Sequence, residues 1–134
     1  LIIKIINEQI HILIQGKVEC GNFDIIEMAP TVQCLTDNYT FSGNSLPYLD
    51  YTLNASSDSI IYDTLQSEEG GRFYREENRN MIILADEDFE DKTPKNFIWL
   101  TLFQVQNLLK FNNFFNIQAR SLISALVTRE NEIN

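Results

Sequence analysis

The residues of this chain best suited to chemistry are arginines, amides and tyrosines. Arginine binds phosphate through two parallel N–H donors, amides hydrogen-bond to sugar hydroxyls, and tyrosine can stack on a base or donate a proton. Such a set is typical of a site for a phosphorylated, hydroxyl-rich ligand. The candidate ligand-binding residues are Gln15, Lys17, Gln33, Asn38, Tyr39, Arg72, Tyr74, Asn78, Arg79 and Arg120.

A simpler interpretation competes for the two arginines at 72 and 79. The stretch SEEGGRFYREENRNMII, residues 67–83, places them among four glutamates. Arg72 and Arg79 would then only form ion pairs on the surface of a hairpin. Because exposed ion pairs are common and contribute little to stability, the residues taken alone favour this hairpin over a ligand site. The four glutamates are Glu68, Glu69, Glu76 and Glu77.

Several other kinds of site are excluded by the residues that the sequence lacks. His11 is the only histidine, so neither a histidine-based zinc site nor a Ser-His-Asp triad fits within the chain. The acidic run 86–91 lacks the spacing of an EF-hand and is predicted to be a solvated loop, and no metal site is expected. There is no P-loop and no GxGxxG. A Nudix box is also absent, although Arg75-Glu76-Glu77 is superficially similar to part of one.

Composition limits the class of protein. The 134 residues, 44% of them hydrophobic, suffice for one domain with a core. The net charge of −9 argues against binding to nucleic acid or to an anionic membrane. The apolar opening, residues 1–16, is interrupted by Lys4, Glu8 and His11, so it is predicted to be neither a signal peptide nor a membrane span. Cys20 and Cys34 fit two reduced thiols, and a cytoplasmic location is expected.

The elements that would position these residues come from local patterns. Residues 10–16 and 23–29 are predicted strands joined by a turn at 20–22, with Pro30 ending the second. A long polar loop at 36–59 precedes a short helix at 59–66, capped by Ser59 or Asp58. A new strand is expected to open at 72–74, and 81–85 is a predicted buried strand.

The last third is predicted to form two helices. Thr101 caps the first, over 102–110, with Leu102, Val105, Leu108 and Leu109 on one face. Asn116 caps the second, over 117–127, with Ile117, Leu122, Ala125 and Leu126 apolar. Strands followed by helices indicate an α+β fold.

Five segments then resemble one enzyme family, in the same order along the chain. They are QGKVECGNFDIIEMAPTVQ (15–33), NYT (38–40), PYLD (47–50), LQSEEGGRFYREENRNMII (65–83) and WLTLFQVQNLLKFNNFFNIQARSLISAL (99–126). Together they resemble the NDP-hexose 2,3-dehydratases. The resemblance implies a lyase that removes water across C2 and C3 of a nucleotide-linked 4-keto-6-deoxyhexose, on the route to deoxysugars. It also implies a Nudix-like mixed sheet with flanking helices, without the Nudix catalytic box, and a homodimer.

The chemistry needs no cofactor. The C3 hydrogen lies α to the C4 ketone, so a base can remove it if fixed donors stabilise the enolate. The C2 hydroxyl can then leave with help from a general acid. On positions that match the family's motifs, Glu68 is assigned as the base and Tyr39 as the acid or enolate donor. The diphosphate would be bound by Lys17, Arg72, Arg79 and Arg120. The sugar or the base would be bound by Gln15, Gln33, Asn38 and Asn78. Tyr74 would stack on the nucleobase or pack on its own strand.

The resemblance covers only part of a family member, which carries two longer tandem repeats. Residues 1–134 are therefore interpreted as a single, partial Nudix-like dehydratase repeat. Thr36 stands where the family usually has an arginine. Three possibilities stay open: a fragment of a full dehydratase, a subunit that completes its site by dimerising, or a non-catalytic nucleotide-sugar-binding or structural module.

Overall fold

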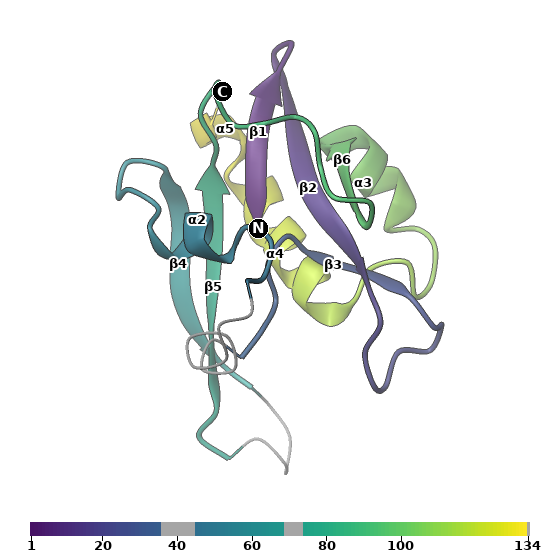
Figure 1. The fold of residues 1–134 in the computed structure, drawn as a ribbon. Coiled ribbons are helices and arrows are strands. Elements are labelled where there is room, and N and C mark those ends of the chain that lie inside the picture. The colour runs from purple at the N-terminus through teal and green to yellow at the C-terminus, as the bar shows by residue number, and fades with distance from the viewer. Residues whose placement is uncertain (36–44, 69–73, 134) are drawn as a thin grey trace.

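The computed structural model of this protein describes residues 1–35, 45–68 and 74–133, and these form a mixed sheet with helices on its faces (Figure 1). The strands are β1 (Ile2–Ile6), β2 (Gln9–Lys17), β3 (Glu27–Pro30), β4 (Ile60–Ser67), β5 (Glu77–Leu84) and β6 (Phe97–Thr101). The helices are α2 (Leu49–Leu53), α3 (Leu102–Leu108), α4 (Ile117–Thr128) and α5 (Glu130–Ile133).

Strand β2 organises the sheet because it changes partner along its length. Residues 9–13 pair with β1, residues 14–17 pair with β3 along the same edge, and β6 pairs with residues 11–15 along the other. Thr31 marks the change of partner. Its hydroxyl accepts a hydrogen bond from the backbone N–H of Ile2 at 2.8 Å and donates to the carbonyl of Leu13. Strand β2 thus joins β1, β3 and β6, and β1 connects them to the β5–β4 pair in one sheet.

Strands β4 and β5 form a hairpin that is attached to the rest of the sheet through β1. Strand β5 runs parallel to β1 and antiparallel to β4, which makes the sheet mixed. Only Ile2 and Ile3 of β1 pair with β5, whereas β4 and β5 remain paired from Ile60 to Ser67. The β4–β5 hairpin therefore projects beyond the rest of the sheet, as Figure 1 shows.

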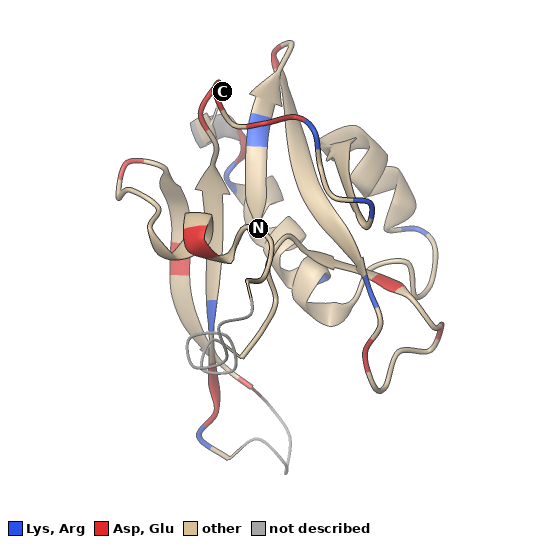
Figure 2. Cartoon of the chain, viewed as in Figure 1, with Lys and Arg blue, Asp and Glu red and all other residues tan. Residues whose placement is uncertain are grey.

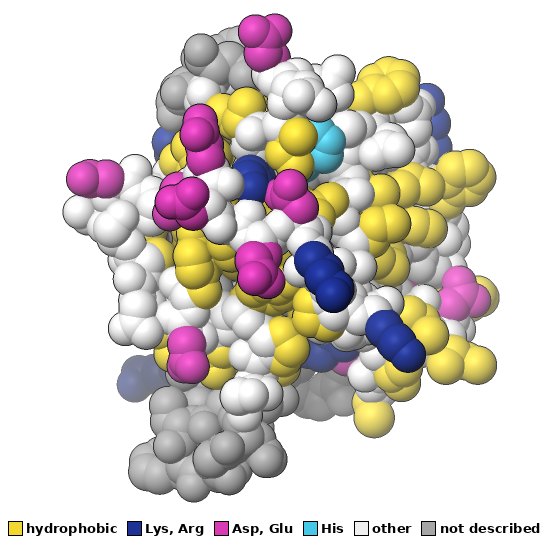
Figure 3. Space-filling view, turned by 45° about the horizontal axis from the view of Figure 1, so that its top comes forward, with side chains coloured by type: hydrophobic (Ala, Val, Ile, Leu, Met, Phe, Trp, Pro, Cys, Tyr) yellow, Lys and Arg dark blue, Asp and Glu magenta, His cyan; other side chains and the backbone are white. Residues whose placement is uncertain are grey.

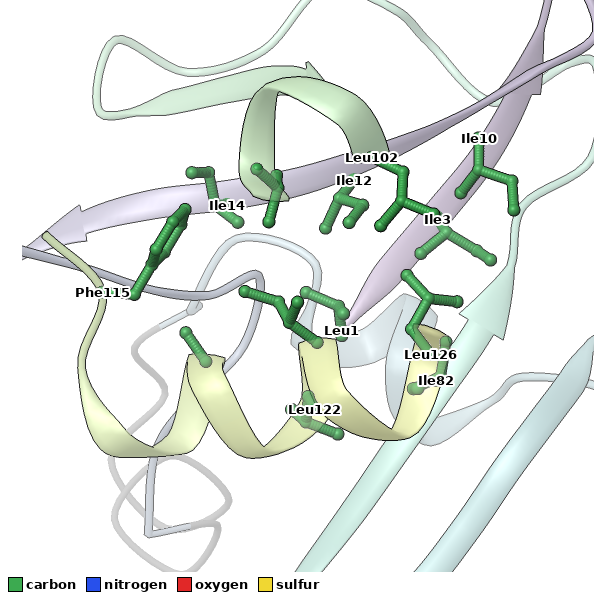
Figure 4. Close-up of a cluster of buried hydrophobic side chains, with 13 residues drawn as sticks. Leu1, Ile3, Ile10, Ile12, Ile14, Ile82, Leu102, Phe115, Leu122 and Leu126 are labelled. Carbon is green, nitrogen blue, oxygen red and sulfur yellow. The ribbon is translucent and has the colours of Figure 1, made fainter. Parts of the chain in front are cut away.

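The main core lies between one face of the sheet and helices α3 and α4. Alternate residues of each strand point to this face, and Figure 4 shows Leu126 of α4 directed toward Ile3 of β1. Thr101 begins α3 with a capping box, and the Asn116 side chain accepts from the N–H of Ala119 to begin α4.

A smaller cluster covers the opposite face. Ile2, Leu13 and Phe97 pack there against four aromatic side chains, namely Tyr48 and Tyr51 at α2, Phe89 in the 86–96 loop and Trp99 on β6. Lys4, only 7% exposed, holds this loop in place. Its ammonium group donates to the carbonyls of Glu87 and Phe89 and to Asp91 Oδ1, at 3.1, 2.6 and 2.9 Å.

Several predicted elements are confirmed. The strand at 10–16 lies within β2, the turn contains Cys20 and Gly21, and β3 ends at Pro30. The buried strand at 81–85 is the core half of β5, and 86–96 is a loop. Both C-terminal helices begin at their predicted caps, Thr101 and Asn116.

The predicted helix at 59–66 is wrong, because this segment is strand β4. Ser59 caps no helix, since its hydroxyl donates to the carbonyl of Ser56 in a turn at 2.8 Å. Ile60, Ile61, Tyr62 and Thr64 are β-branched or aromatic, and such residues suit a pleated surface. The long pairing with β5 then settles the conformation.

The predicted strand at 23–29 is correct only from Glu27 onward. Pairing with β2 stops at Lys17 and Glu27, and the segment before Glu27 leaves the sheet, with Phe23 84% and Ile25 82% exposed.

Position 74, expected to open a strand, lies in a turn, and residues 72 and 73 lie outside the described part. The apolar faces were also misjudged at Leu109 and Ile117, which are 38% and 66% exposed.

Strands β1 and β6 were not predicted. A two-residue turn joins β1 to β2 at Asn7 and Glu8, both with positive φ (51° and 63°). This is the turn class that suits a hairpin, but the Asn-Gly signal that usually reveals it is absent. Strand β6 is short and runs straight into the cap of α3, so its partner β2 defines it more than its own pattern does.

Candidate functional site

The predicted site residues fall into two groups in the described structure. The first group lies where the end of β2 meets the start of α4, and contains Lys17, Gln33 and Arg120. The Lys17 ammonium donates to the Gln33 carbonyl at 2.7 Å and pairs with Glu19 at 3.0 Å. The Gln33 amide nitrogen donates to both oxygens of Glu19, at 3.1 and 3.2 Å.

Asn116 extends this network into helix α4. Its amide nitrogen donates to Gln33 Oε1 at 2.8 Å, while its Oδ1 caps the helix through the N–H of Ala119. Its backbone N–H donates to the carbonyl of Met28, which attaches the helix start to β3. Arg120 follows one turn later, and its Nε donates to the Asn116 carbonyl at 3.4 Å. Three predicted ligands are thus joined through Glu19 and Asn116.

Gln15 lies close to this group but is already engaged. It is 6% exposed, and its amide nitrogen donates to the carbonyls of Pro30 and Thr31 at 3.0 and 3.1 Å. These carbonyls belong to the point where the chain leaves β3. The amide nitrogen of Gln15 therefore holds the backbone at Pro30 and Thr31 in place, so it stabilises the fold.

The second group lies on the projecting part of the β4–β5 hairpin. Glu68 follows β4 directly, and its carboxylate accepts a hydrogen bond from the Asn78 amide. The backbone N–H of Glu68 donates to the carbonyl of Glu76 at 2.8 Å, which continues the ladder by one step. Among the described residues Glu68 forms no ion pair, unlike Glu19 and Asp63. Its carboxylate thus has an amide donor and no cationic partner there.

Arg79 points to the face of the hairpin opposite Asn78, since consecutive residues of a strand alternate. Its guanidinium makes a bidentate contact with Asp63, with Nε and Nη2 at 2.9 and 2.6 Å from the two carboxylate oxygens. The hydrogen bond and charge of Arg79 lower the pKa of Asp63, and the pKa of Arg79 is raised in return. Figure 2 shows this pair of opposite charges on the two strands. The sequence-based expectation of ion pairing is therefore met for Arg79, but with Asp63 rather than with the four glutamates.

The remaining predicted residues are either exposed or outside the described part. Tyr74 is 83% exposed, and the Arg75 guanidinium lies over its ring at 5.3 Å from the centroid. Among the described residues Tyr74 does not pack on a strand, because it lies in the turn. Asn38, Tyr39 and Arg72 lie outside the described residues, so their predicted roles stay predictions.

Sequence reasoning missed several polar residues beside the predicted ones. The Asn80 amide donates to Gln66 Oε1 at 3.0 Å, and both lie on the same hairpin face as Asn78. The face therefore carries a strip of amides that ends at Glu68. The sequence did contain a pattern that indicates this polar face, because polar residues recur at every second position in 64–68 and 78–80. Asn116 was identified only as a cap, and Glu19 not at all.

Two further properties concern the chain as far as it is described. Within residues 1–35, 45–68 and 74–133, no three His, Cys, Asp or Glu side chains are grouped so that they could hold a metal ion. In the same ranges no helix has both the length and the apolar character needed to cross a membrane.

Burial raises the pKa of the Cys34 thiol, although Lys17 acts in the opposite direction.

Comparison with known proteins gives one consistent result. The model of the NDP-hexose 2,3-dehydratase family matches residues 1–126. A dTDP-4-dehydro-6-deoxy-alpha-D-glucopyranose 2,3-dehydratase from Saccharopolyspora spinosa is 44% identical over 128 residues, covering 94% of this chain and 26% of that protein. Proteins of the same name from Streptomyces violaceoruber and Amycolatopsis orientalis are 37% and 36% identical, covering 93% and 87% of this chain and 28% and 25% of their own lengths. The chain thus spans about a quarter of the length of these curated relatives.

Proposed function

Because this chain belongs to the NDP-hexose 2,3-dehydratase family, we propose that it takes part in removing water across C2 and C3 of a nucleotide-linked 4-keto-6-deoxyhexose. The observation that carries the proposal is the family match along residues 1–126, which extends over both groups of polar residues. The names of the relatives support a dTDP-linked sugar as the substrate.

Glu68 is the proposed base in this reaction. The C3 hydrogen is acidic because the negative charge left by its removal is delocalised onto the oxygen of the adjacent C4 ketone, which gives an enolate. A carboxylate can take this proton if it is accessible and not neutralised by a cation. Glu68 is partly exposed, and in the described structure it is held by the Asn78 amide alone among side chains. Tyr39, which lies outside the described residues, is proposed to donate to the enolate oxygen or to the leaving hydroxyl.

The two polar groups would bind different parts of the substrate. The amide strip that contains Asn78 suits sugar hydroxyls, whose donors and acceptors amides can match. Arg120 suits the diphosphate, together with Arg72 outside the described part. Lys17 and Arg79 are paired with Glu19 and Asp63, so much of their charge is already compensated within the chain. A phosphate would have to compete with these two carboxylates for the side chains of Lys17 and Arg79.

A second candidate function rests on the length of the match. Because the chain spans about a quarter of its relatives, it could bind the nucleotide sugar without completing a catalytic site. The two candidates differ in one property only, namely turnover. Both predict that dTDP binds.

The test is calorimetric titration of the chain with dTDP, followed by incubation with dTDP-4-keto-6-deoxyglucose and mass analysis of the sugar. Binding with loss of one water supports the dehydratase. Binding with an unchanged sugar supports the binding module. Failure of dTDP to bind would overturn both, provided that circular dichroism shows the chain to be folded.

Three coarser features accompany the proposal. We propose a Nudix-like relation for the mixed sheet, a homodimer as the assembly and the cytoplasm as the location. The exposed apolar side chains Phe103 on α3 and Ile117 on α4 (72% and 66% exposed) support association with a further protein surface. Sedimentation equilibrium would test the homodimer directly, since a monomeric mass at all concentrations would contradict it.

A further inference from the structure

A polar pocket of about 260 Å³ lies where the α3–α4 connection meets the first turn of α4. Lys110, Asn112, Asn113 and Arg120 contribute to its lining, with Phe111 and Phe115 beside them. None of the described residues that line it is Asp or Glu. In a chain with 19 acidic and 10 basic residues, whose acidic side chains are spread over the face in Figure 3, a pocket with two cations and no Asp or Glu in its described lining is unusual.

The charges of these two cations are not compensated within the described structure. Within the described ranges, Lys110 donates to the neutral Asn107 side chain at 2.9 Å, and the Arg120 side chain donates only through Nε, to a backbone carbonyl at 3.4 Å. Neither forms an ion pair among the described residues, in contrast to Lys4, Lys17 and Arg79. The terminal nitrogens of Arg120 have no hydrogen-bond partner among the residues that the structure describes, and an arginine fork binds phosphate oxygens in pairs.

An apolar pocket of about 410 Å³ adjoins the polar one. The two share Phe111, Asn112 and Asn113 as lining residues. Ile26, Met28, Leu108 and Phe114 form most of its wall, Asp24 completes the lining, and Phe111 is 66% exposed. An exposed ring beside a cavity offers a stacking surface for a planar base. One connection thus separates a cationic pocket from an apolar one.

We propose that residues 108–120 bind the nucleoside diphosphate part of the substrate, with the diphosphate at Lys110 and Arg120 and the base in the apolar pocket against Phe111. The inference rests on the proposed function for the identity of the ligand. It goes further in adding Lys110 and Phe111 as recognition residues. It also places the nucleotide at the start of α4, apart from the hairpin that carries Glu68.

The test compares two ligands, dTDP and inorganic pyrophosphate, by calorimetric titration of the 134-residue chain. Lys110→Ala and Arg120→Ala should each weaken both ligands by about tenfold or more, since each loses a charge-assisted contact. Phe111→Ala should weaken dTDP and leave pyrophosphate unchanged. Lys95→Ala is the matched control, because Lys95 is an exposed lysine in the loop before β6 and should affect neither ligand.

The outcomes separate this inference from the proposed function. If dTDP binds the wild-type chain and both cation variants equally, the pocket assignment is overturned while nucleotide binding stands. If pyrophosphate binds through Lys110 but dTDP binds no more tightly than pyrophosphate does, the anion pocket is supported and the nucleotide-binding function is contradicted. If neither ligand binds the folded wild-type chain, both are wrong.

Discussion

The amide nitrogen of Asn116 lies 2.8 Å from Gln33 Oε1, which joins the start of α4 to a segment 83 positions earlier in the chain. Asn116 is 5% exposed, and its other amide atom caps the helix. Gln33 in turn binds Glu19, the partner of Lys17. The position of Arg120 therefore depends on contacts made by segments that are remote in sequence.

Asn116→Ala should lower the free energy of unfolding by about 2 kcal/mol. Loss of the helix cap contributes ~1 kcal/mol and loss of the buried contact with Gln33 a similar amount. Urea denaturation measures the change. Asn96→Ala is the control, since Asn96 is exposed and its side chain makes no hydrogen bond among the described residues. Asn116→Asp keeps the capping oxygen but not the donor, so its stability should lie between those of wild type and Asn116→Ala. Equal effects of Asn116→Ala and Asn96→Ala would contradict this view.

Lys4→Met should destabilise the chain by about 1–3 kcal/mol, because it leaves the carbonyls of Glu87 and Phe89 without their donor. Asp91→Ala should cost less than about 1 kcal/mol, since Asp91 is 69% exposed in its side chain and the ion pair is largely solvated. Thermal unfolding of the two variants gives the comparison. Limited proteolysis should cut residues 86–96 faster in Lys4→Met. Equal stabilities would mean that the charge pair, rather than the carbonyl contacts, holds the loop.

Arg79→Met should raise the pKa of Asp63 back toward its ordinary value, since Arg79 is what lowers it. A lowered folded-state pKa stabilises the fold above the unfolded pKa, about 3.9, and this contribution disappears as the pH falls through the folded value. The two proteins should therefore differ by roughly 0.2–1 kcal/mol at neutral pH, as exposed pairs do, and converge at strongly acidic pH. Carboxyl NMR titration of Asp63 follows the shift. Arg75→Met, which removes the cation over Tyr74, should leave the Asp63 pKa unchanged.

Glu68→Gln should reduce turnover of the 4-keto sugar by about 10²–10⁴ while dTDP affinity is retained, because an amide cannot take the C3 proton. The measurement is the rate of water loss in whichever form of the enzyme is active. Glu76→Gln removes a nearby carboxylate that accepts no hydrogen bond from Asn78 in the described structure, and it should keep full activity. Full activity of Glu68→Gln would show that another group is the base.

The sequence predicted those parts of the fold that local interactions determine. Thr101 and Asn116 mark the helix starts because a capping side chain bonds to the N–H groups of its own next turn. The buried halves of β2 and β5 were recognisable from short apolar, β-branched runs. Family-like segments also pointed to a nucleotide-sugar enzyme, and the family match over residues 1–126 agrees.

Only the tertiary structure decided which candidate residues lie together. Asn78 and Arg79 are neighbours in sequence but point to opposite faces, because they lie on a strand that pairs with β4, and consecutive side chains of a strand alternate. Segment 59–66 became a strand because it pairs with β5, whose residues lie 12 or more positions away, and no local pattern specifies that partner. Lys17, Gln33 and Arg120 came together through Glu19 and Asn116. Pairing between distant segments fixes both the face and the neighbour of a side chain, and local sequence carries little information about either.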